Sequence, residues 1–171
     1  MWSVTAMSDA TGRLSRVKAV DRARAFAVIG EAVWWITIVD ATLVRHRHQA
    51  YDAVLAGQSS VQRQLIEEAL AGLRFLRNRI SGEADLAEFI DPGEPAGQTP
   101  ITGWTWKPLA EPALVSRAPR GQAWEMSRYR AYQTQLAGHP TGEIFGRTAG
   151  FLRLAATDVP TLTDISAQAA P

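Results

Sequence analysis

Residues 26–44 read FAVIGEAVWWITIVDATLV, a stretch whose apolar side chains would cover most of the perimeter of a helix. Its 19 residues approach the length of a membrane span, but Glu31 and Asp40 would be costly inside a bilayer. Trp34 and Trp35 lie in the middle of the stretch, whereas a membrane favours tryptophan at its interfaces. We therefore expect a central helix buried by its neighbours, in a cytoplasmic protein with no membrane segment.

The helical pattern around this stretch extends over about residues 20–56, with a possible kink at 44–48. A second helix over about residues 60–80 carries a clear apolar stripe, and Ser59 with Gln62 matches a capping box at its start. Because so few residues join the two helices, we predict that they pack as an antiparallel hairpin.

A segment rich in proline and tryptophan follows the hairpin. Residues 91–120 hold six of the nine prolines, which excludes a helix interior. The same segment holds many large apolar side chains, which is unusual for a disordered linker. Residues 101–106, ITGWTW, alternate in polarity and predict a short strand or an extended strap that buries Trp104, Trp106 or both.

Two more helical patterns, over about residues 122–137 and 141–156, complete the chain. The predicted fold class is all-α, with the hairpin completed by these two helices and the irregular strap between them. We expect one domain over residues 18–157, a flexible lead at 1–17 and a flexible tail at 158–171.

The composition excludes several classes of function. The 171 residues include 18 basic and 17 acidic side chains, so the chain is no bulk polycation, although a local basic patch is compatible with this balance. It has no cysteine and three histidines, which argues against thiolate chemistry and a histidine-rich metal centre. Phosphate-cradling glycine loops, dinucleotide fingerprints and nucleophile elbows do not occur. We expect neither a metal nor a cofactor.

The main candidate site lies in residues 73–80, LRFLRNRI, near the end of the second helix. Arg74, Arg77 and Asn78 are three or four residues apart and share one helix face, with Arg79 beside them. Arginine suits bidentate recognition of phosphate, and asparagine adds a donor and an acceptor. A structural interpretation stays open, because cations near a helix C-terminus also complement the helix dipole.

The sequence RHRH at residues 45–48 is a second basic feature. His46 and His48 are two residues apart and cannot chelate one metal from a regular helix. His48 is either a phosphate-binding residue or part of a solvated surface. In the hairpin Arg77 would approach Asp40, so we predict an Asp40–Arg77 ion pair in which the acid orients the arginine. The arginines of the last two helices are interpreted as solvated surface unless they share a face with Arg74 and Arg79.

An Arg77–Asn78 pair near the end of a helix, behind an antiparallel hairpin, resembles the HEPN superfamily (higher eukaryotes and prokaryotes nucleotide-binding domains). Residues 71–79 and the tryptophan-rich stretches also resemble bacterial proteins of this kind. The resemblance implies a small α-helical domain, frequently dimeric, and in many members a ribonuclease. In the family an Arg and a His four to six residues beyond it are thought to act on the 2′-hydroxyl and the scissile phosphate. This chain departs from the pattern, because residues 78–83 contain no histidine.

The resemblance therefore implies a degenerate member that binds RNA or a protein partner without strong catalysis. Any activity would be that of a metal-independent endoribonuclease. The alternative is an α-helical interaction or structural module with no nucleic-acid role, and a carboxylate-based hydrolase is a third hypothesis. Trp34 and Trp35 on an apolar helix also favour a homodimer, with the first two helices of each chain forming a four-helix interface.

Overall fold

The computed structural model describes residues 2–18, 21–82, 85–92, 101–111 and 118–157. The fold is mostly helical, which confirms the all-α prediction. The α-helices are α1 (Trp2–Arg13), α2 (Arg22–His46), α3 (His48–Ala56), α4 (Ser60–Gly82), α5 (Pro119–Gln135) and α6 (Thr141–Thr157). Two short strands, β1 (Ile90–Asp91) and β2 (Thr105–Trp106), and two 3₁₀ turns, Leu86–Glu88 and Ile101–Gly103, lie between α4 and α5.

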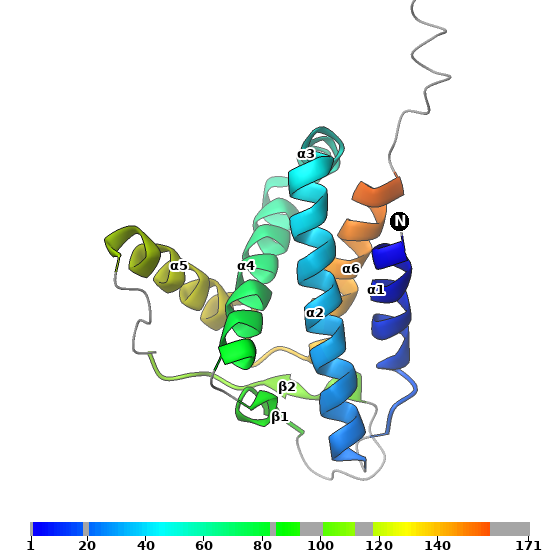
Figure 1. Cartoon of the computed structure of the whole chain (residues 1–171), viewed down its shortest axis with the longest axis vertical. Helices are drawn as coiled ribbons and strands as arrows, with labels where there is room; N and C mark the ends of the chain where they lie inside the picture. Colours follow the sequence, from blue (N-terminus) through cyan, green and yellow to red (C-terminus); the bar gives the residue numbers. More distant parts are fainter. Residues whose placement is uncertain (1, 19–20, 83–84, 93–100, 112–117, 158–171) are drawn as a thin grey trace, which may run out of the picture.

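The predicted antiparallel hairpin is formed by α2 and α4, which run side by side in opposite directions (Figure 1). On the other side of α2 lie α1 and α6, so α2 is the central helix of the layer. Half of the most apolar window of α2 is buried in the protein, although its length and hydropathy alone would also suit a membrane span. Asp21 caps the start of α2 by accepting a hydrogen bond from the Arg24 backbone N–H.

The helical pattern expected over residues 20–56 is divided into two helices, α2 and α3, and the break at Arg47 lies within the possible kink at 44–48. This residue has φ −144° and ψ 37°, and α3 continues in a new direction. The break is stabilised by tertiary contacts, since Arg47 Nη1 donates a hydrogen bond to the Ala156 carbonyl oxygen at 2.7 Å. The Tyr51 ring of α3 also packs edge-on against Phe151 of α6, with centroids 5.0 Å apart. Packing of α3 onto α6 therefore overrides the helical propensity of the sequence.

The flexible lead expected at residues 1–17 is wrong, because most of it forms α1. Met7 and Ala10 are fully buried, and the Trp2 ring meets Trp35 of α2 edge-on at 5.0 Å. A 12-residue helix has little stability in isolation, so its packing against α2 must supply most of its stability. The tail predicted at residues 158–171 lies outside the described residues.

The proline- and tryptophan-rich strap closes one end of the bundle. β1 and β2 pair antiparallel, with Ile90 opposite Trp106. Trp104 and Trp106 are both fully buried, Trp104 against Phe26 of α2 and Trp106 against Phe145 of α6. The predicted burial of both indoles is confirmed, but only residues 105–106 of the predicted extended segment 101–106 form a strand, since 101–103 form a 3₁₀ turn. Residues 93–100 and 112–117 lie outside the described residues.

The two predicted C-terminal helices are α5 and α6, each within three residues of its expected start. α5 packs on the side of α4 that faces away from α1 (Figure 1). Gly72 of α4 makes this approach possible, because a Cβ atom there would lie 3.0 Å from the Tyr132 Cα atom and 2.7 Å from the Leu136 side chain. The close contact brings one face of α5 next to the arginine-rich end of α4.

Candidate functional site

An open groove of about 370 Å³ lies where α2, α4 and α5 meet. Its lining residues are Thr37, Ala41, Val44 and Arg45 of α2, Arg74, Arg77 and Asn78 of α4, and Trp124 and Arg128 of α5. Four of these nine residues are arginines that come from three helices. The predicted residues Arg74, Arg77 and Asn78 thus lie together in one groove, as their spacing on α4 indicated.

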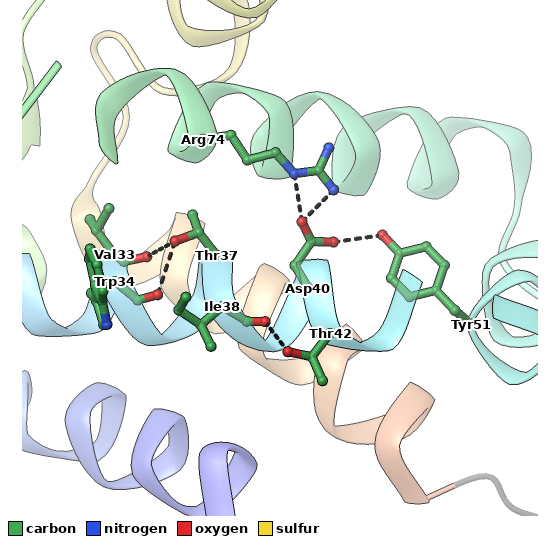
Figure 2. Close-up of polar contacts among 8 residues, drawn as sticks. All are labelled: Val33, Trp34, Thr37, Ile38, Asp40, Thr42, Tyr51 and Arg74. Atoms are coloured by element: carbon green, nitrogen blue, oxygen red, sulfur yellow. Dashed lines mark hydrogen bonds and ion pairs between the residues drawn. The ribbon is translucent and has the colours of Figure 1, made fainter. Parts of the chain in front are cut away.

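Asp40 lies behind the groove, on the buried side of α2. Its side chain is fully buried, and the Arg74 guanidinium binds it through Nε, 2.6 Å from Oδ2, and through Nη2 (Figure 2). The Tyr51 hydroxyl donates a hydrogen bond to Oδ1 at 3.0 Å. Both carboxylate oxygens therefore have a donor, which a buried acid requires.

The electrostatics of this network follow from its burial. Burial raises the pKa of the Asp40 carboxyl above its ordinary value, and the charge and hydrogen bonds of Arg74 oppose this rise. Burial and the neighbouring Asp40 also raise the pKa of the Tyr51 hydroxyl, which keeps it protonated and a donor. Arg74 remains partly exposed, with 32% of its side chain accessible, so it connects the buried acid to the groove.

The ion pair predicted between Asp40 and Arg77 is instead formed by Arg74, one helical turn earlier. The prediction assumed an unbroken helix from Asp40 to the turn at residues 57–59. Because the chain bends at Arg47, the register between α2 and α4 shifts by three residues. The Arg77 guanidinium carbon lies 4.5 Å from the centre of the Trp34 ring, which is a cation–π contact between α4 and α2.

A second arginine–tryptophan contact lies across the groove on α5. The Arg128 guanidinium carbon is 3.6 Å from the centre of the Trp124 ring, four residues earlier on the same helix. Burial lowers the pKa of Arg128, the positive charge of Arg74 lowers it further, and Asp40 opposes both effects. The groove therefore holds arginines close enough to repel one another. Arg74 is paired with the buried carboxylate of Asp40, and no acidic residue is among the described residues that line the groove.

Two of the predicted site residues lie elsewhere. Arg79 Nη1 is 4.0 Å from Glu125 Oε1, so this arginine links α4 to α5 beside the groove and does not line it. His48 is exposed at the start of α3 and does not line the groove either, whereas Arg45 of the same RHRH sequence does. Sequence reasoning did not place Trp124 and Arg128 in the site. Their i, i+4 spacing puts both on one face of α5, but only the packing of α5 against α4 places that face at the groove.

Protein-family models, curated proteins and solved structures give no match to the chain. Among the described residues, no group of three His, Cys, Asp or Glu side chains is arranged to hold a metal ion. The groove must therefore be interpreted from its own chemistry. It offers guanidinium groups to anions, and it has exposed indole rings beside them.

Proposed function

We propose that the protein binds RNA in the groove between α2, α4 and α5, in the manner of a HEPN-like domain that has lost strong catalysis. The observation that carries this proposal is the convergence of Arg45, Arg74, Arg77 and Arg128 on one open groove. Guanidinium groups donate planar, bidentate hydrogen bonds that match phosphate oxygens. A local charge of this kind can bind a polyanion even though the whole chain has a formal net charge of only +1.

The size and polar groups of the groove fit a nucleotide unit. A volume of about 370 Å³ is within the range of small-ligand sites, and the open shape lets a chain enter and leave. Asn78 is exposed among the arginines and provides both a donor and an acceptor. A ribose 2′-hydroxyl is also both a donor and an acceptor, which makes Asn78 a suitable partner for RNA.

The same groove supports binding better than cleavage. RNA cleavage at the 2′-hydroxyl needs a group that accepts and donates protons near neutral pH. Among the described residues that line the groove there is no His, Asp or Glu, and Asp40 lies behind it, already held by Arg74 and Tyr51. We therefore expect RNA to leave the complex intact.

Fluorescence anisotropy with a labelled single-stranded RNA of about 12 nucleotides tests the proposal. Three phosphate contacts give a slope of about −2 for log affinity against log salt, a loss of about 20-fold between about 50 and 200 mM. Arg77→Ala and Arg128→Ala should each weaken binding and reduce this slope by about 0.7. Arg153→Ala is the matched control, because this exposed arginine of α6 does not line the groove.

Absence of RNA binding at low salt would refute the proposal and favour the alternative, an α-helical interaction module. Three exposed apolar side chains around the groove support this alternative, namely Trp34, Val44 and Trp124. The homodimer expected from the sequence stays a prediction. Part of the apolar surface that suggested it is covered within the chain, because Trp2 of α1 packs against Trp35.

A further inference from the structure

The six tryptophans of the chain have very different surroundings. Trp104 and Trp106 are fully buried, and Trp35 packs against the core beside Trp2. Trp124 is 63% exposed and Trp34 is 45% exposed, and each has an arginine of the groove stacked on its ring. Core packing therefore explains Trp35, Trp104 and Trp106, whereas Trp2, Trp34 and Trp124 stay exposed, and of these three Trp34 and Trp124 contact arginines of the groove.

Trp124 is not needed to attach α5 to α4. That contact is made by buried or half-buried side chains on another face of α5 and just beyond its end, namely Tyr129, Tyr132 and Leu136. Trp124 instead forms a ridge between two hollows, since it lines both the groove and a second, shallower hollow with Arg120. Arg128 stacks on one face of this ring, and the 63% exposure of the side chain leaves the rest of its surface available to a ligand.

The spacing along α5 puts a cation on each side of this ring. Arg120, Trp124 and Arg128 are four residues apart, so they lie along one face of the helix. They extend over about 12 Å of helix, which is enough for more than one nucleotide. The order cation, aromatic, cation matches the alternation of phosphate and base along an extended strand.

We infer that the groove selects unpaired nucleotides, with a base stacked on Trp124 and the flanking phosphates bound by Arg120 and Arg128. The exposed Trp34 ring, which contacts the groove residue Arg77 but does not line the groove, provides a second stacking surface beside it. This inference rests on the proposed RNA binding and specifies its substrate as single-stranded. In a duplex both faces of each base are already stacked, so a duplex can use the arginines but not the indoles.

The test compares a single-stranded RNA with a blunt duplex of the same sequence and length, by anisotropy at one salt concentration. Wild type should bind the single strand at least about 10-fold more tightly than the duplex. Trp124→Leu should lose about 10-fold in single-strand affinity and much less in duplex affinity, and Trp34→Leu should act in the same direction. Trp124→Phe keeps a stacking ring and should retain most of the single-strand affinity. Because both indoles are exposed, circular dichroism should show that all three variants are folded.

The possible failures can be told apart. If the single strand and the duplex bind equally, or if Trp124→Leu binds the single strand as wild type does, the inference is overturned. Salt-sensitive binding that depends on Arg77 would in that case still support the proposed function. If neither RNA binds wild type at low salt, both the inference and the proposed function are overturned.

Discussion

Replacing Arg74 with leucine removes the cation that holds the buried carboxylate of Asp40. Opposite charges about 4 Å apart attract each other by about 4 kcal/mol at an effective dielectric constant of about 20. Water reaches the partly exposed Arg74 and screens part of this energy, and Asp40 can take up a proton in the variant. We therefore expect the free energy of unfolding at pH 7 to fall by about 2–3 kcal/mol. Urea unfolding followed by circular dichroism measures this change.

The stability that Arg74→Leu loses should depend on pH, and the protonation of Asp40 sets the direction of this dependence. Burial raises the pKa of this carboxyl in the folded protein above 3.8, its ordinary value. A carboxyl group with a raised folded pKa contributes stability that is fully present below the unfolded pKa and is lost as pH rises through the folded pKa. Arg74→Leu removes the charge that opposes this rise, so the folded pKa of Asp40 moves further up. The deficit of the variant should therefore be smallest near pH 4 and grow toward pH 7.

Arg147→Leu provides the matched control on another helix. Arg147 forms an ion pair with Glu143 at 2.7 Å, but Glu143 is 44% exposed, so the expected loss is at most about 0.5 kcal/mol with little dependence on Asp40. Equal losses for the two variants would refute the argument that burial of Asp40 sets the cost. A deficit for Arg74→Leu that stays constant between pH 4 and pH 7 would refute it as well.

Three further changes test the packing around the site. Tyr51→Phe removes the hydroxyl that donates to Asp40 and should lower the free energy of unfolding by about 1–3 kcal/mol in urea unfolding, whereas a change below about 0.5 kcal/mol would contradict this bond. Gly72→Ala puts a Cβ atom 3.0 Å from the backbone of α5 and should destabilise the protein by about 1–3 kcal/mol. Gly150→Ala in α6 has open space around it and should stabilise the protein by about 0.5–1 kcal/mol, so thermal melting of the two variants should show opposite shifts. Arg47→Ala removes a hydrogen bond to a carbonyl oxygen near the end of α6 and should cost about 1–2 kcal/mol, with faster amide exchange in α3; unchanged exchange would show that this contact does not hold the bend.

Local patterns in the sequence were sufficient for much of the fold. The apolar stripe and capping box predicted α4, and the helical patterns over 122–137 and 141–156 predicted α5 and α6. The buried indoles at residues 104 and 106 followed from large apolar groups in a segment too rich in proline for a helix. α1 was not predictable in this way, because it is stabilised by contacts with α2 and α6. The sequence indicated a possible kink at 44–48, but not the change in register that the bend at Arg47 produces, because the bend is stabilised by a contact with α6.

The candidate site, like the fold, could be predicted from the sequence only in part. Arg74, Arg77 and Asn78 could be grouped from the sequence because they occupy one face of a single helix. The α5 residues Trp124 and Arg128 could not be assigned to the site from the sequence, because their position depends on how α5 crosses α4. The close approach of the two helices at Gly72 sets this crossing. The partner of Asp40 was missed for a related reason, because a register counted through an assumed continuous helix is wrong once that helix bends.

The position of Asp40 also bears on how the groove would treat an anion. In the described part of the chain, Arg74 uses Nε and Nη2 to bind Asp40, and its fork still has further N–H donors on a side chain that is 32% exposed. Asp40 thus fixes the orientation of Arg74 while cancelling much of its charge. Arg128 stacks on the Trp124 ring, which orients its guanidinium group without adding a negative charge. The groove therefore combines one arginine positioned by an acid with one positioned by an aromatic ring, and the salt dependence of binding should come more from Arg128 than from Arg74.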